Sequence, residues 1–199
     1  MGDVAAIILA AGASSRFRAA AGAAGPATKL VATRDGEPLV RRVAHAALSS
    51  RARPVVVVTG FAQEEVAATL AGLPLAHAHN PDYATGLASS LKTGVAALPA
   101  SVGGVIVLLG DMPDITARVI DALIDAFVKN PDVAAVVPVF AGERGNPALI
   151  SRRLFAEVAA LKGDAGARKL LADVANVFEV SIDDRAVAFD VDTPEALNG

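Results

Sequence analysis

Two basic residues and a run of very small residues stand close together near the start of the chain. The run Ala10-Ala11-Gly12-Ala13-Ser14-Ser15 follows the apolar segment 4–9 and precedes Arg16 and, further on, Lys29. Small side chains let a backbone approach a ligand closely and leave its N–H groups free to face an anion. A buried strand, a tight loop and two cations therefore suit a polyphosphate group, although an ordinary strand-to-helix turn can carry the same residues.

Carboxylates are a second kind of candidate. Asp111 follows the apolar segment 104–109 and a single glycine, which places it where a buried strand would end. Mg²⁺ prefers oxygen ligands and usually shares them with phosphates and water. Asp111 could instead cap the helix that follows, but Asp114 or Thr116 is better placed for that role. We therefore expect Asp111 to hold a metal ion at the end of its strand.

Two more acids stand near the C-terminus, in the segment Asp190-Val191-Asp192-Thr193-Pro194-Glu195. We expect that one of the two, Asp190 or Asp192, faces the ligand and that the other does not. Asp192 is placed to cap a helix that has Pro194 in its first turn, a common pattern at helix starts. Asp190 is then the better second metal ligand.

Other well-known site patterns are absent from the sequence. The dinucleotide-binding loop needs three glycines at fixed spacing, and only Gly12 is present at this turn. No Gly-Lys-Ser/Thr run of a Walker loop occurs. His77 and His79 would share one face of a strand but lack a third ligand nearby, so a zinc site is not expected.

Composition limits the class of protein. The 199 residues are 53% hydrophobic, which suits one folded domain over residues 1–199 with a substantial core. The net charge of −3 gives no general basic surface for nucleic acid, and no apolar run is long enough to span a membrane. Without cysteine there is neither a disulfide nor a thiolate metal site. Since no basic flank precedes the first apolar run, the chain is expected to be cytoplasmic.

Hydrophobic periodicity predicts alternating strands and helices. Strands are expected at 4–9, 54–58, 75–79, 104–109, 133–139, 177–182 and 186–191, and helices at 37–50, 63–71, 87–98, 115–128, 152–161 and 165–173, with a turn at 193–197. Such alternation indicates an α/β fold with a mainly parallel sheet, in which ligands lie beyond the carboxyl ends of the strands. Residues 10–16 and 110–113 should then meet at one edge. The Ala/Gly-rich segment 18–28 is expected to be an extra helical turn or a mobile flap, and its few packing side chains favour the flap.

The sequence Leu9-Ala10-Ala11-Gly12-x-Ser14-x-Arg16-Phe17, followed by Lys29-Leu30, resembles the signature loop of the MobA-like nucleotidyltransferases. Gly110-Asp111-Met112-Pro113 resembles their Gly-Asp-Met-Pro metal motif, and the segment 190–195 resembles their C-terminal motif. The resemblance covers essentially the whole chain and implies a three-layer Rossmann-like sandwich of the nucleotide-diphospho-sugar transferase type. Arg18 stands where the family usually has glycine, and the spacer before Lys29 is several residues longer than usual.

The resemblance also implies roles for individual residues. Arg16, Lys29 and Asp111 would be catalytic, and Asp111 and Asp190 would hold Mg²⁺ as the cofactor. The nucleotide would be bound by Leu9, Ala10, Ala11, Gly12, Ser14, Arg16, Lys29 and Gly110.

Three further segments resemble parts of the molybdopterin cytidylyltransferases within this family. They are Asn80-Pro81-Asp82-Tyr83-Ala84-x-Gly86-Leu87-Ala88-Ser89-Ser90-Leu91, Arg144-Gly145-Asn146-Pro147-Ala148 and Gly163-Asp164-x-Gly166-Ala167-Arg168. Taken singly, each could be a surface turn. The first places two serines in the opening turn of a helix, which is a natural seat for a phosphate, and the second resembles a loop near the acceptor. The expected acceptor-binding residues are therefore Ser89, Ser90 and Asn146.

The resemblance implies an enzyme that moves a nucleoside monophosphate from a Mg-bound NTP to the phosphate of molybdopterin or the molybdenum cofactor and releases pyrophosphate. Ala11 favours CTP, because cytidylyl members tend to have Ala-Ala-Gly at this turn where guanylyl members have Ala-Gly-Gly. Expected partners are CTP or another NTP, a phosphorylated small-molecule acceptor, and a molybdoenzyme or its chaperone. Three alternatives stay open: a sugar or polyol phosphate as the acceptor, an oxidoreductase, and a non-catalytic cofactor-binding protein. The presence of Arg16, Lys29 and Asp111 argues against the last of these.

Overall fold

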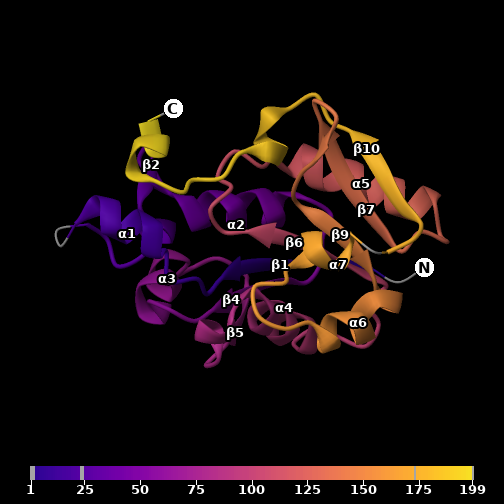
Figure 1. Ribbon diagram of the computed structural model, residues 1–199, viewed down its shortest axis with the longest axis horizontal. Helices are drawn as coiled ribbons and strands as arrows, with labels where there is room; N and C mark the ends of the chain where they lie inside the picture. The colour runs from indigo at the N-terminus through magenta and orange to yellow at the C-terminus, as the bar shows by residue number, and fades with distance from the viewer. Residues whose placement is uncertain (1–2, 23–24, 173, 199) are drawn as a thin grey trace.

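The structure is a computed structural model that describes residues 3–22, 25–172 and 174–198. Its main sheet is built from β1 (Val4–Ala10), β4 (Val55–Thr59), β5 (Ala76–His79), β6 (Gly104–Leu109), β7 (Ala135–Phe140), β8 (Glu143–Arg144), β9 (Ala148–Ser151) and β10 (Val177–Ser181). These strands follow the order β10-β7-β9-β6-β1-β4-β5, and β8 pairs with β7 (Figure 1). A separate short hairpin joins β2 (Thr33–Arg34) to β3 (Glu37–Pro38).

Most neighbouring strands of the main sheet run parallel, as the sequence predicts. β1 pairs in parallel with β4 and β6, β4 with β5, and β7 with β10. β9 lies between β6 and β7 and runs antiparallel to both, so the sheet is mixed but mostly parallel. The sequence analysis did not identify β9 as a strand, because it is only 4 residues long and is buried throughout, without alternation.

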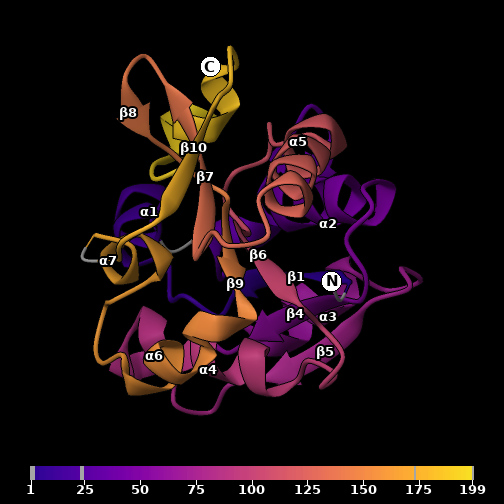
Figure 2. The same ribbon diagram turned by 90° about the vertical axis from the view of Figure 1, so that its right-hand side faces the viewer.

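Helices cover both faces of the sheet and give three layers (Figure 2). One face packs against α2 (Leu39–Ser49), α3 (Gln63–Thr69) and α5 (Ala117–Lys129). The other face packs against α4 (Leu87–Ala96), α6 (Phe155–Ala160) and α7 (Ala167–Leu170). This arrangement confirms the predicted three-layer α/β sandwich. None of the described helices has both the length and the apolar character needed to cross a membrane.

The first strand illustrates why the buried strands are apolar throughout. Its successive side chains point to opposite faces of the sheet. Ala6 and Ile8 join the core under α2 and α5, whereas Ile7 and Leu9 join the core under α4. A strand covered on both faces needs apolar side chains in both directions, so its sequence is continuously apolar rather than alternating.

Two predicted elements near the C-terminus differ from the structure. Residues 186–191 do not form a strand, because the chain turns there into a 3₁₀ helix, η4 (Arg185–Ala188), followed by irregular backbone. The Asp184 carboxylate accepts a hydrogen bond from the Ala186 N–H at 2.9 Å, a local bond that competes with strand formation. The helix predicted at 165–173 is present only as α7, and residue 173 lies outside the described residues. The other 3₁₀ helices are η1 (Lys29–Val31), η2 (Tyr83–Thr85), η3 (Arg152–Leu154) and η5 (Pro194–Asn198).

The Ala/Gly-rich segment 18–28 begins as a helix. α1 (Ser15–Ala21) runs into it, so its first part is a helical turn, which is one of the two structures considered for it. Residues 23–24 lie outside the described residues. The segment ends at Thr28, which is fully buried and whose hydroxyl lies 2.9 Å from the Ser14 hydroxyl. The mobility of the segment stays a prediction.

Candidate active site

The pairing of β1 with β6 brings two loops to one edge of the sheet. Leu9 and Leu109 are aligned in register, and the Gly110 N–H donates a hydrogen bond to the Leu9 carbonyl at 3.0 Å. A Cβ at position 110 would lie 3.1 Å from that carbonyl oxygen, so the close approach favours glycine. Asp111 is thereby held beside the loop that follows β1, as the sequence predicts.

The loop after β1 is open, and the helix that follows it is anchored. Gly12 is exposed, and Ser14 precedes α1 with a positive φ of 50°. Phe17 is only 2% exposed and belongs to a small apolar cluster at this end of the molecule. Because Phe17 fixes α1, the side chain of Arg16 is left 79% exposed beside the loop.

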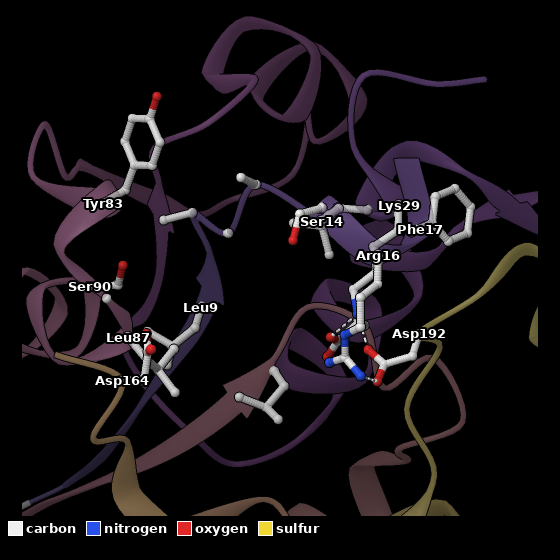
Figure 3. A pocket seen from close by; sticks show the side chains of 18 of the residues that line it. Leu9, Ser14, Arg16, Phe17, Lys29, Tyr83, Leu87, Ser90, Asp164 and Asp192 are labelled. Atoms are coloured by element: carbon white, nitrogen blue, oxygen red, sulfur yellow. Dashed lines mark hydrogen bonds and ion pairs between the residues drawn. The ribbon is translucent and has the colours of Figure 1, made fainter. Parts of the chain in front are cut away.

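A cavity of about 720 Å³ lies over this edge of the sheet (Figure 3). Ala10 does not line it, because its side chain is buried in the core on the α2 face, and Gly110 supports it only through the backbone. The predicted nucleotide-binding residues that do line it are Leu9, Ala11, Gly12, Ser14, Arg16 and Lys29.

Lys29 joins two carboxylates inside this cavity. Its Nζ lies 2.7 Å from Asp111 Oδ2 and 2.9 Å from Asp192 Oδ1, and its side chain is only 12% exposed. Nη1 of Arg16 lies 2.7 Å from the other oxygen of Asp192. Both predicted cations are therefore paired with acids here, and they must exchange these partners in order to bind phosphate.

One backbone bond fastens the C-terminal segment to the Asp111 loop. The Val191 N–H donates to the Asp111 carbonyl at 2.9 Å, and the Val191 side chain is fully buried. The flanking residues Asp190 and Asp192 each place a carboxylate oxygen within 4.8 Å of the other and of an Asp111 oxygen. Asp192 lines the cavity and pairs with Lys29 and Arg16, whereas Asp190 is not among the residues that line it. Which of the two acids faces a ligand stays a prediction.

The three carboxylates fit a divalent cation. Oδ1 of Asp111 is buried and has no hydrogen-bond partner among the described residues. A buried oxygen without a partner is costly, and a metal ion would satisfy it. Asp111 is also free of helix capping, because the Thr116 side chain accepts the Val119 N–H at the start of α5. Oxygen atoms gathered from three acids match the ligand preference of Mg²⁺.

The charges of the site shift its pKa values in opposite directions. Although the side chain of Asp190 is exposed, partial loss of hydration, together with repulsion from Asp111 and Asp192, raises its pKa. Partial burial also opposes ionisation of Asp192, but hydrogen bonds and attraction from Lys29 and Arg16 outweigh it and lower the pKa of Asp192. Burial disfavours the charge of Lys29 as well, yet the same two acids raise its pKa overall. Lys29 thus stays protonated, whereas the fold opposes the charge of Asp190.

The predicted acceptor residues are divided between two cavities. Ser90 lines the first cavity, and its hydroxyl accepts a hydrogen bond from the Asn80 amide at 3.0 Å. The Ser89 hydroxyl accepts from the same amide at 2.8 Å and donates to the Gly86 carbonyl, so it is used within the turn before α4. Asn146 lines an adjoining cavity of about 440 Å³. The acceptor roles of these residues stay predictions.

Several residues that line the first cavity received no role from the sequence. Tyr83, Leu87 and Asp164 line it on the side opposite Arg16 and Lys29 (Figure 3). All three stand in segments that resemble the family, and this resemblance was the signal that could have identified them. Their positions depend on loops that periodicity does not describe.

A small-residue loop, two cations and neighbouring carboxylates therefore meet at the carboxyl edge of the sheet. The chain belongs to the family described as the MobA-like NTP transferase domain, whose family model matches residues 6–178. It is 28% identical to the molybdenum cofactor cytidylyltransferase of Escherichia coli (strain K12) over 145 residues, which are 71% of this chain and 70% of that protein.

Solved structures share the whole fold. The crystal structure of Rv0371c from Mycobacterium tuberculosis H37Rv superimposes with a TM-score of 0.82 and 26% identity, covering 98% of this chain and 95% of that one. A complex of the same protein with manganese covers 92% of this chain and 89% of that one, with a TM-score of 0.72 and 24% identity. A nucleotidyl transferase from Methanothermobacter thermautotroptrophicus has a TM-score of 0.83 and 21% identity, covering 98% and 94%. These likenesses confirm the nucleotide-diphospho-sugar transferase type of fold.

The contacts of Lys29 predict that it competes with a metal ion for Asp111 and Asp192. We expect Lys29→Met to bind Mn²⁺ about tenfold more tightly than wild type without nucleotide, a difference of about 1.4 kcal/mol. The reason is that the substitution removes a cation held 2.7 and 2.9 Å from the two acids. Electron paramagnetic resonance of free Mn²⁺ measures the affinity, with Lys129→Met as the control. Unchanged or weaker Mn²⁺ binding by the Lys29 variant would contradict this competition.

The raised pKa of Asp190 predicts a stability effect with a definite pH dependence. Because the folded-state pKa lies above the ordinary 3.8, the ionised carboxylate destabilises the fold, and this penalty disappears as the pH falls through the raised pKa. In metal-free buffer at about pH 7, Asp190→Asn should therefore melt at a higher temperature than wild type. This difference in melting temperature should become smaller as the pH is lowered towards 3.8. Calorimetry at each pH measures the melting temperatures of the variant and of wild type. The control is Asp132→Asn, at a side chain that is 96% exposed. A lower melting temperature of the Asp190 variant at neutral pH is the outcome that contradicts it.

Proposed function

We propose that the chain transfers CMP from Mg-bound CTP to the phosphate of molybdopterin or of the molybdenum cofactor, with release of pyrophosphate. The observation that carries this proposal is the meeting of Arg16, Lys29, Asp111 and Asp192 at one cavity beside the small-residue loop, with an Asp190 oxygen within 4.8 Å of the other two acids. The Escherichia coli relative supports cytidylyl transfer and this acceptor. The Ala-Ala-Gly sequence at residues 10–12 supports CTP in the same way. Delivery of the product to a molybdoenzyme or its chaperone belongs to the same proposal.

The proposed metal is held by Asp111 together with Asp190 and Asp192. The unpartnered Oδ1 of Asp111 supports this assignment, as does the manganese complex of the mycobacterial relative. When bound, Mg²⁺ supplies positive charge to the phosphate oxygens of the nucleotide.

In the proposed reaction an oxygen of the acceptor phosphate attacks the α-phosphorus of CTP. The bond from the α-phosphorus to the oxygen that bridges it to the β-phosphorus breaks, and pyrophosphate leaves with that oxygen. The acceptor phosphate has a second pKa of about 6 and is already ionised at neutral pH, so no side chain needs to remove a proton. Catalysis then rests on positioning and charge balance. Arg16 and Lys29 turn from the acids to the triphosphate and balance the charge of the leaving group.

The metal role of Asp111 predicts a loss of turnover without a loss of fold. Asp111→Asn keeps the shape of the side chain but removes the charge that would hold Mg²⁺. We expect pyrophosphate release from Mg-CTP and acceptor to fall by more than about tenfold, a barrier increase above about 1.4 kcal/mol. Circular dichroism checks the fold, and Asp132→Asn is the matched loss of charge at a remote site. Turnover close to that of wild type would exclude the metal role.

The loop sequence predicts a preference for CTP over GTP. Ala11 is 3% exposed and packs at the turn that forms one wall of the cavity. Calorimetric titration with each nucleotide in the presence of Mg²⁺ should give the lower Kd for CTP. A lower Kd for GTP would assign the chain to the guanylyl members of the family. Product analysis with glucose 1-phosphate as a competing acceptor tests the sugar-phosphate alternative in the same assay.

A further inference from the structure

A guanidinium group lies over an aromatic ring close to the first cavity. Cζ of Arg18 is 4.7 Å from the centre of the Phe61 ring, a distance at which the positive charge is attracted to the face of the ring. Within residues 3–22, 25–172 and 174–198 this guanidinium has no ion pair or hydrogen bond, so the ring is the contact that orients it. Glycine is usual at position 18 of the family's loop, so this contact is not a general feature of the family.

Phe61 in turn contacts Tyr83. The two ring centroids lie 6.2 Å apart and the ring planes meet at 67°, which is the edge-to-face arrangement that aromatic pairs prefer. Tyr83 begins η2 and lines the first cavity on the side opposite Arg16 and Lys29 (Figure 3). Arg18 and Phe61 are not among the residues that line this cavity. The three side chains therefore form a row that leads from α1 to the cavity wall.

The backbone around Phe61 is fixed against the small-residue loop. The Phe61 N–H donates a hydrogen bond to the Ala11 carbonyl at 3.1 Å. A Cβ at Gly60 would lie 2.6 Å from Tyr83 Cβ and 2.8 Å from Ala11 Cβ, so glycine lets these three segments meet closely. Since the backbone is held in this way, the side-chain torsions of Phe61 and Tyr83 are the freedom that remains, and ring contacts restrict them.

Tyr83 lies where the nucleoside part of a bound nucleotide would be. Arg16 and Lys29, which are proposed to hold the triphosphate, stand on the other side of the cavity (Figure 3). The base and ribose would then extend towards Tyr83. Its hydroxyl makes no hydrogen bond within the described part of the chain, and its ring offers an apolar surface to a ligand. The direction in which this ring is held therefore affects how well the nucleoside is bound.

We propose that Arg18 and Phe61 are positioning residues that hold the Tyr83 ring in place for the nucleoside part of the nucleotide. Arg18 restrains the Phe61 ring, and the Phe61 ring restrains Tyr83. Arg18 is not a phosphate ligand, although it stands two residues from Arg16. Side chains two apart on a helix face different directions, and Arg16 faces Asp192 whereas Arg18 faces Phe61. The inference rests on the proposed function, because it needs a nucleotide in the first cavity.

Fluorescence of the free protein tests the positioning directly, because the chain has 1 tyrosine and no tryptophan. Quenching of the Tyr83 emission by acrylamide should be stronger in Arg18→Met and in Phe61→Leu than in wild type, since each change removes part of the restraint on the ring. The controls are Arg118→Met on α5 and Phe178→Leu on β10. They replace an exposed arginine and an exposed phenylalanine that do not line the first cavity, and quenching should not change in them.

Calorimetric titration measures the consequence for binding. Arg18→Met should weaken the binding of Mg-CTP by about threefold, as expected for an exposed cation–π contact, and should leave that of Mg-tripolyphosphate within about 1.5-fold of wild type. Phe61→Leu should weaken Mg-CTP by about fivefold, because it also removes the edge-to-face contact. The double variant should bind Mg-CTP as Phe61→Leu does, since the arginine acts through the ring. Arg18→Lys, which keeps a cation at this position, should recover part of the loss.

The inference is overturned if acrylamide quenching of Tyr83 is the same in Arg18→Met as in wild type. Equal weakening of Mg-CTP and Mg-tripolyphosphate also overturns it, and would make Arg18 a phosphate ligand. Additive losses in the double variant overturn it as well, because Arg18 would then act independently of Phe61. A wild-type chain that fails to bind Mg-CTP contradicts the proposed function, whereas normal binding of Mg-CTP with unchanged quenching in the variants contradicts only the positioning role.

Discussion

The parallel pairing of β1 with β6 is the contact on which the candidate site depends. It aligns Leu9 with Leu109 and lets the Gly110 N–H bond to the Leu9 carbonyl, so the small-residue loop and Asp111 begin at neighbouring points. Leu9 and Leu109 also line both cavities. A slip of one residue would turn every side chain of β1 to the other face. The packing of helices on both faces therefore holds the register, and through it the distance between the loop and the acid.

The second constraint on this site is that its charged side chains must exchange ion-pair partners when ligands bind. Three carboxylates face two cations, and the cations are held at 2.7–2.9 Å from Asp111 and Asp192. In the proposed function the carboxylates turn to the metal ion while Arg16 and Lys29 turn to the triphosphate. In that proposal, a metal ion that binds the carboxylates leaves Arg16 and Lys29 without acidic partners and available to the triphosphate. Binding of the metal ion therefore favours binding of the nucleotide, and the reverse.

The contact between α4 and the loop before α7 divides the binding surface. Gly86 and Gly163 touch without side chains between them, and the Ala88 N–H bonds across the contact. This contact holds Asp164 at the boundary of the two cavities. The two adjoining cavities are thus bordered by segments that are far apart in the sequence but share one backbone junction.

The sequence by itself determined the main strands and helices, because continuous apolar runs and helical spacing record burial on two faces of a sheet. It also placed Asp111 beside the small-residue loop, since both follow strands that run in parallel. It did not identify β9, which is too short for periodicity, and it predicted a strand at 186–191 where the Asp184 side chain starts a 3₁₀ turn.

Only the tertiary structure decided the role of Asp192. Its bond to Lys29 joins residues 163 positions apart, and the Val191 bond to the Asp111 carbonyl holds its segment beside Asp111. Arg168 and Lys169 likewise line one cavity only when the loop before α7 packs against α4. Periodicity is a local property of the chain, whereas ion pairs and cavities arise from segments that meet after the whole sheet has packed.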